Sequence, residues 1–75
     1  MIQQRINKIW AEALDLNDIG ENDDFFALGG HSLIMARIQG AIKDEFGTEI
    51  PMDELFRHST VAGISTYLES RVSAA

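Results

Sequence analysis

Four stretches of this 75-residue chain place apolar residues three and four positions apart, the spacing of one face of an α-helix. The first stretch runs from Ile2 to Leu16, and the second runs from Ser32 to Phe46. A short third stretch follows Pro51, since proline is tolerated at a helix start, and the fourth follows Thr60, a good N-cap residue. The pattern predicts an all-α chain: a small four-helix bundle with the short third helix packed across its end.

Finer spacing predicts which residues of these helices are buried. In the second helix, the side toward the core holds Met35, Ile38, Ile42 and Phe46, and Gly47 is a suitable C-cap. The short third helix continues through Asp53, Leu55 and Phe56, and the buried stripe of the fourth helix is Val61, Ile64, Leu68 and, by extension, Val72. We expect residues 1–75 to form a single domain, with residues 70–75 as a frayed tail.

A long loop is predicted between the first two helices, from Asn17 to His31. A loop of this length in a compact domain needs apolar residues to pin it. The expected pins are Ile19, Phe25, Phe26 and Leu28, and Asp23 is the expected cap of the short turn through Phe25 and Phe26.

Composition excludes several classes of function. The chain has no cysteine, and His31 and His58 are too few and too far apart to argue for a metal site. The net charge is −6, and no lysine or arginine interrupts the acidic stretch between Asp15 and Ser32, which opposes binding to nucleic acid or to an anionic membrane. With neither a signal peptide nor a membrane-length apolar stretch, we expect a cytoplasmic location. We also expect the chain to be a monomer.

The segment from Leu28 to Leu33, here called the Gly-Gly-His-Ser segment, carries the strongest functional signal. Gly29 and Gly30 permit backbone conformations closed to other residues and let a partner approach closely. Ser32 opens the second helix at a position where serine is a favoured cap. An exposed hydroxyl there lies beside unpaired N–H groups and a partial positive charge, an environment that suits an attached phosphate.

With the residues before it, the stretch Asp-Asp-Phe-Phe-Ala-Leu-Gly-Gly-His-Ser-Leu (23–33) resembles the core motif of peptidyl carrier proteins, the thiolation domains of nonribosomal peptide synthetases. The resemblance implies that Ser32 takes 4′-phosphopantetheine from coenzyme A, through the action of a phosphopantetheinyl transferase. It further implies that an adenylation domain loads the thiol with an aminoacyl group, which passes to a condensation domain or another tailoring enzyme. Such a chain is no enzyme but a covalent shuttle.

His31 resembles the residue before the serine in aminoacyl and peptidyl carriers, because fatty-acid, polyketide and aryl carriers typically have aspartate at this position.

A helical wheel places Leu33, Arg37, Gly40 and Asp44 on the outer side of the second helix. Beside Ser32, we expect His31, Leu33 and Arg37 to form a surface for partner enzymes. The sequence leaves open which amino acid is carried, and whether the chain is freestanding or an excised domain.

Two alternatives come from other classes of protein. One is a helical interaction module with a carrier-like fold whose Ser32 is not modified. The other is a small serine hydrolase, which the residues disfavour: adjacent His31 and Ser32 do not form an oriented dyad, and the Gly-x-Ser-x-Gly elbow fails at Ile34.

Overall fold

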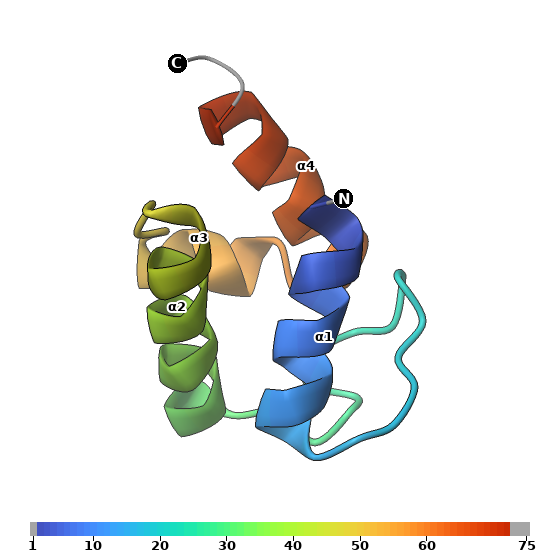
Figure 1. Cartoon of the computed structure of the whole chain (residues 1–75). Coiled ribbons are helices and arrows are strands. Elements are labelled where there is room, and N and C mark those ends of the chain that lie inside the picture. Colours follow the sequence, from blue (N-terminus) through green and yellow to red (C-terminus); the bar gives the residue numbers. More distant parts are fainter. Residues whose placement is uncertain (1, 73–75) are drawn as a thin grey trace.

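The computed structural model describes residues 2–72, except for the side chain of Val72, and contains four helices in this range. Helix α1 spans Ile2–Leu14, α2 spans Ser32–Phe46, α3 spans Met52–Arg57 and α4 spans Val61–Val72. Helix α1 packs against both α2 and α4, while the short α3 lies across the far end of α2 (Figure 1). The predicted all-α four-helix arrangement is therefore confirmed.

The core is formed by apolar side chains from every helix and from the loops. Trp10 is fully buried, and its ring meets Phe25 edge-on, with 5.4 Å between the ring centroids. An edge-to-face pair of this kind stabilises the fold beyond the area that it buries. The other buried apolar residues are Ile6, Ile19, Met35, Ile38, Ile42, Ile50, Leu55, Val61, Ile64 and Leu68.

Helix α2 follows the predicted pattern most closely. It begins at Ser32, ends at Phe46 and is followed by Gly47 in the left-handed conformation, with φ 71°. Its predicted core residues Met35, Ile38 and Ile42 are fully buried, and Phe46 is half-buried. The predicted cap of α4 is also confirmed, because the Thr60 hydroxyl accepts a hydrogen bond from the Gly63 N–H at 3.0 Å.

Helix α1 ends two residues before the predicted boundary at Leu16. Asp15 adopts φ 58°, in the left-handed region, which interrupts the helical hydrogen-bond ladder. Leu16 lies beyond that break and is 37% exposed. At the other end of the chain, α4 continues through residues 70–72 of the predicted frayed tail, and residues 73–75 lie outside the described range.

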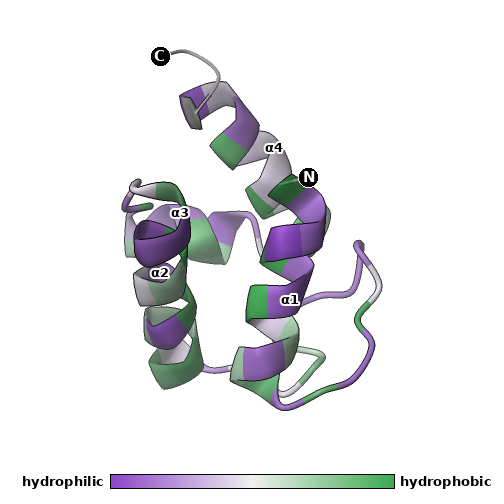
Figure 2. Ribbon diagram, in the orientation of Figure 1, coloured by the Kyte–Doolittle hydropathy of each residue, from purple (hydrophilic) through white to green (hydrophobic). Residues whose placement is uncertain are grey.

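The loop between α1 and α2 bows away from the side of α1 opposite α2 and returns beneath the bundle to the beginning of α2 (Figure 1). It is largely hydrophilic, as the colouring of Figure 2 shows. Two of its predicted pins, Ile19 and Phe25, are buried, and Leu28 is half-buried. None of the helices within residues 2–72 is long and apolar enough to cross a membrane.

Phe26, the fourth predicted pin, contacts the bundle at its surface rather than in the core, because 50% of this residue is exposed. Neighbouring residues in a turn point in different directions, and Phe25 occupies the core position. The Phe26 ring instead stacks on Phe56 of α3, with centroids 5.6 Å apart and planes 16° from parallel. Phe26 thus joins the loop to α3 at the surface.

Candidate functional site: the beginning of helix α2

Ser32 is the first residue of α2 and is exposed to solvent. The N-cap is His31, whose backbone is extended (φ −150°, ψ 178°) and whose carbonyl accepts the Met35 N–H at 3.0 Å. The expectation that Ser32 occupies the cap position is therefore corrected by one residue. The first turn of a helix leaves backbone N–H groups without intrahelical acceptors, so the hydroxyl lies at an electropositive helix end.

The Ser32 hydroxyl differs from the other serine hydroxyls in residues 2–72. Ser59 donates to Asp24 at 2.7 Å, and Ser70 donates to the Tyr67 carbonyl at 2.9 Å. Ser65 is buried, with 3% of its surface exposed. Within this range, Ser32 combines solvent exposure with a hydroxyl that takes part in none of the side-chain hydrogen bonds. Its oxygen is accessible to a reagent or an enzyme.

Glycine is required at positions 29 and 30 for two different structural reasons. Gly29 has φ 93°, a conformation that favours glycine, and no atom other than those of its chain neighbours lies within 4 Å of where its Cβ would be. A Cβ at Gly30 would overlap the buried Phe25 ring. The segment therefore passes closely over the core at Gly30 and leaves open space at Gly29, just before the serine.

A turn over residues 25–29 leads into this segment. The Asp24 carboxylate caps it: its Oδ2 accepts the N–H of Phe26 at 3.0 Å and that of Ala27 at 3.2 Å. The predicted cap Asp23 instead accepts the Gly20 N–H at 2.9 Å, so that prediction was wrong. The capped N–H groups lie two and three residues after Asp24, which is the spacing of an Asx-turn and makes Asp24 the better placed of the two.

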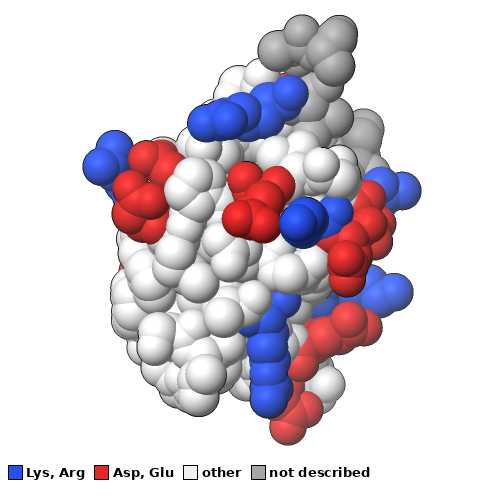
Figure 3. All heavy atoms as spheres, turned by 90° about the vertical axis from the view of Figure 1, so that its left-hand side faces the viewer, with Lys and Arg blue, Asp and Glu red and all other residues white. Residues whose placement is uncertain are grey.

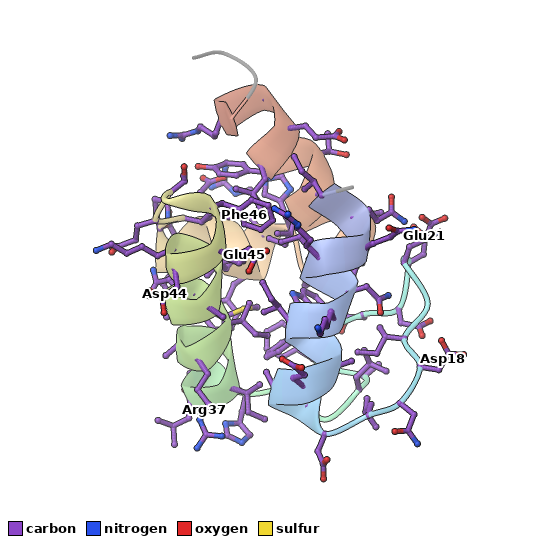
Figure 4. All side chains as sticks on the ribbon, in the orientation of Figure 1. Asp18, Glu21, Arg37, Asp44, Glu45 and Phe46 are labelled. Carbon is purple, nitrogen blue, oxygen red and sulfur yellow. The ribbon has the colours of Figure 1, made fainter. Side chains whose placement is uncertain are left out.

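The three residues predicted to form a partner surface are all exposed: His31, Leu33 and Arg37. Leu33 is 73% exposed, and Arg37 points away from the bundle near the beginning of α2 (Figure 4). The face of the molecule seen in Figure 3 carries a broad area without charged side chains at its lower left, beside a column of basic and acidic side chains. By contrast, Asp18 and Glu21 project from the loop on the far side of α1 (Figure 4).

The comparison with protein families decides the identity of this fold and site. The sequence model of the family described as "Phosphopantetheine attachment site" matches residues 4–68, which include all of α2 and the loop before it. The chain belongs to the phosphopantetheine attachment site family. The resemblance found in the motif before and around Ser32 thus extends over most of the chain.

The chain is also similar to parts of much longer proteins. Surfactin synthase subunit 3 of Bacillus subtilis (strain 168) is 46% identical over 69 residues, which are 92% of this chain and 5% of that protein. The dimodular nonribosomal peptide synthase of the same organism is 42% identical over 66 residues, 88% of this chain and 3% of that protein. The chain therefore spans a small fraction of the length of these relatives.

A solved structure agrees with the family assignment. The chain superposes with a TM-score of 0.92 and 28% identity on a chain from the structure of the phosphopantetheine transferase Sfp in complex with coenzyme A and a peptidyl carrier protein. The match covers 95% of this chain and 92% of that chain. The fold of the chain thus agrees with the family that its sequence shows.

Proposed function

We propose that Ser32 is the residue of this carrier domain to which 4′-phosphopantetheine is attached. Membership in the phosphopantetheine attachment site family indicates which cofactor is attached, and the surroundings of Ser32 indicate the residue that carries it. The observation that carries the assignment is the exposed Ser32 hydroxyl at the start of α2, outside the side-chain hydrogen bonds of residues 2–72.

The residues around Ser32 suit a phosphodiester. The N–H groups of the first turn of α2 favour negative charge beside the hydroxyl. Open space at Gly29 leaves room for a bulky group, and Leu33 and His31 are exposed on either side of the serine. The fit is consistent with a group that lies on the surface rather than in the core.

In the attachment step, the Ser32 oxygen attacks the pyrophosphate of coenzyme A. A bond forms between Oγ and the phosphorus atom that bears the pantetheine, the bond from this phosphorus to the bridging oxygen breaks, and 3′,5′-ADP leaves. The serine proton passes to a base of the phosphopantetheinyl transferase or to solvent. This chain contributes the nucleophilic oxygen and the electropositive helix end.

We further propose that the chain acts in nonribosomal peptide synthesis as a covalent shuttle and is not itself an enzyme. When bound, phosphopantetheine supplies a terminal thiol that carries an aminoacyl or peptidyl group as a thioester, a role that no side chain of this cysteine-free chain can fill. The proposed partners are the transferase, an adenylation domain and a condensation or other tailoring domain. Tethering raises the local concentration of the cargo near these partners.

Residues 1–75 are proposed to act as one carrier domain, and the proposed location is the cytoplasm, where coenzyme A is available. The surface of His31, Leu33 and Arg37 is proposed to contact the partner enzymes, because all three are exposed near the attachment residue.

Intact-mass analysis tests the assignment after incubation of the chain with coenzyme A and a broad-specificity phosphopantetheinyl transferase. We expect one added phosphopantetheine on the wild type and on Ser70→Ala, and none on Ser32→Ala. Ser70 is the matched control because it is also an exposed serine. An unmodified wild type, or a modified Ser32→Ala variant, would refute the assignment and favour the unmodified interaction module.

A further inference from the structure

Two hydrogen bonds join the long loop to the connection between α3 and α4. The Ser59 hydroxyl donates to Oδ1 of Asp24 at 2.7 Å, and the Ser59 carbonyl accepts the N–H of Phe25 at 2.8 Å. The partners are adjacent in the loop, so Ser59 holds residues 24 and 25 at two points. A contact between segments 35 residues apart fixes the position of the loop relative to the helices.

The second carboxylate oxygen of Asp24, Oδ2, accepts hydrogen bonds from the turn over residues 25–29. It accepts the N–H groups of Phe26 and Ala27, while the Asp24 carbonyl accepts the Leu28 N–H at 3.1 Å. Asp24 therefore links Ser59 on one side to the turn over residues 25–29 on the other.

That turn leads directly to the attachment residue. The Gly29 N–H donates to the Phe26 carbonyl at 3.1 Å, and the Gly30 N–H donates to the Phe25 carbonyl at 3.0 Å. Ser32 follows Gly30 by two residues. The hydrogen-bonded path from Ser59 through Asp24 thus ends where the Gly-Gly-His-Ser segment enters α2.

We propose that Asp24, held by Ser59, is a positioning residue for modification of Ser32: it keeps the turn over residues 25–29 in the conformation that presents Ser32 to the transferase. This inference rests on the proposed function of Ser32. A transferase that binds an already ordered segment avoids the entropic cost of ordering it in the complex. Loss of the Asp24 carboxylate should therefore weaken binding, while a bound Ser32 still reacts.

The experiment is steady-state modification of the full chain by a phosphopantetheinyl transferase with saturating coenzyme A. Four variants are compared at a temperature where circular dichroism shows that all are folded: Asp24→Ala, Ser59→Ala, Asp24→Asn and Asp23→Ala. Asp24→Asn removes the same charge as Asp24→Ala but retains an acceptor oxygen for the turn. Asp23→Ala removes the neighbouring carboxylate, whose bond goes to Gly20.

We expect Asp24→Ala to raise KM by roughly five- to tenfold and Ser59→Ala by roughly two- to fivefold, with kcat within about twofold of wild type. Asp24→Asn and Asp23→Ala should stay within about twofold of the wild-type KM, as expected if acceptor geometry rather than charge is responsible. Amide hydrogen exchange of Leu28 and Gly30 in the unmodified chain should be faster in Asp24→Ala than in Asp23→Ala.

Other outcomes separate the inference from the proposed function. A wild-type KM in folded Asp24→Ala, with only a lower melting temperature, would mean that Asp24 supports the fold alone and would overturn the inference. Equal increases in all three aspartate variants would assign the effect to charge and would also overturn it. Failure of the wild type to be modified on Ser32 would refute the proposed function itself, and the inference with it.

Discussion

The ring of Phe25 fills the space that a side chain at position 30 would occupy. Phe25 is fully buried against Trp10, so the core extends directly beneath the segment that leads to Ser32. Packing in the centre of the bundle and the path of the Gly-Gly-His-Ser segment are therefore coupled through the contact between Phe25 and Gly30.

Gly30→Ala should destabilise the fold, because the added methyl group overlaps a buried ring that has little room to move. Overpacking of this kind costs about 1–3 kcal/mol in the free energy of unfolding. Gly40→Ala is the matched control, since Gly40 lies within α2 and, apart from its chain neighbours and the backbone of this helix, nothing is within 4 Å of its Cβ position. That change should stabilise the chain by about 0.5–1 kcal/mol. Urea denaturation measures both, and equal effects would contradict the overlap at Gly30.

The two adjacent phenylalanines should respond very differently to truncation. Phe25→Ala removes a fully buried ring and should cost about 3–5 kcal/mol, which can approach the whole stability of a domain this small. Phe26→Ala removes a half-exposed ring stacked on Phe56 and should cost about 1 kcal/mol. Thermal unfolding followed by circular dichroism distinguishes them. A loss at Phe26 as large as that at Phe25 would contradict the exposed placement of Phe26.

Leu33→Ala should leave the free energy of unfolding within about 0.5 kcal/mol of wild type, because this side chain is 73% exposed. If Leu33 contacts the transferase, the same change should slow modification by roughly fivefold, equivalent to about 1 kcal/mol at an interface. Ile42→Ala, on the buried side of the same helix, should show the reverse: a lower melting temperature with normal modification of the folded fraction. Normal kinetics for Leu33→Ala would remove Leu33 from the partner surface.

The stability of the loop should depend on acid through Asp24. The hydrogen bond from Ser59, opposed by desolvation and aided by the N–H groups of Ala27 and Phe26, lowers the pKa of Asp24 below its usual 3.8. A carboxyl whose pKa is lower in the folded state contributes stability above its unfolded pKa and loses this contribution as pH falls through the folded value.

Wild type and Ser59→Ala should therefore differ in stability at pH 6, and the difference should shrink as the pH falls below 3.8 toward the lowered pKa of Asp24. Urea denaturation at a series of pH values measures this. A difference that stays constant through the acid range would mean that the Ser59 hydroxyl does not act on the Asp24 carboxylate.

The helices were predictable because their signals are local and periodic. The stripe of Met35, Ile38 and Ile42 and the residues Gly47 and Thr60 give the limits of α2 and the start of α4, and the structure confirms them. The end of α1 was wrong by two residues, because the apolar spacing continues to Leu16 while Asp15 leaves the helical conformation.

The loop was less predictable, because a turn has no period that separates its buried residues from its exposed ones. Hence Phe25 and Phe26 were both expected to pin the loop, whereas Phe25 is buried and Phe26 is half-exposed; Asp23 was expected to cap the turn, whereas Asp24 does so. The bond between Ser59 and Asp24 spans 35 residues, and no spacing rule in the sequence indicates it. At the site, the motif over residues 23–33 indicated Ser32, and the helical wheel predicted that Leu33 is exposed. The roles of both residues toward partner enzymes stay predictions.

Trp10, the single tryptophan of the chain, lies edge-on against Phe25, and the Phe25 ring packs directly against Gly30. Its indole emission is consequently a built-in optical signal that requires no dye or label. Any rearrangement of the Gly-Gly-His-Ser segment that shifts the Phe25 ring should alter this emission. Spectra taken before and after cofactor loading can therefore follow, in unlabelled material, how far a change at the surface serine reaches into the protein interior.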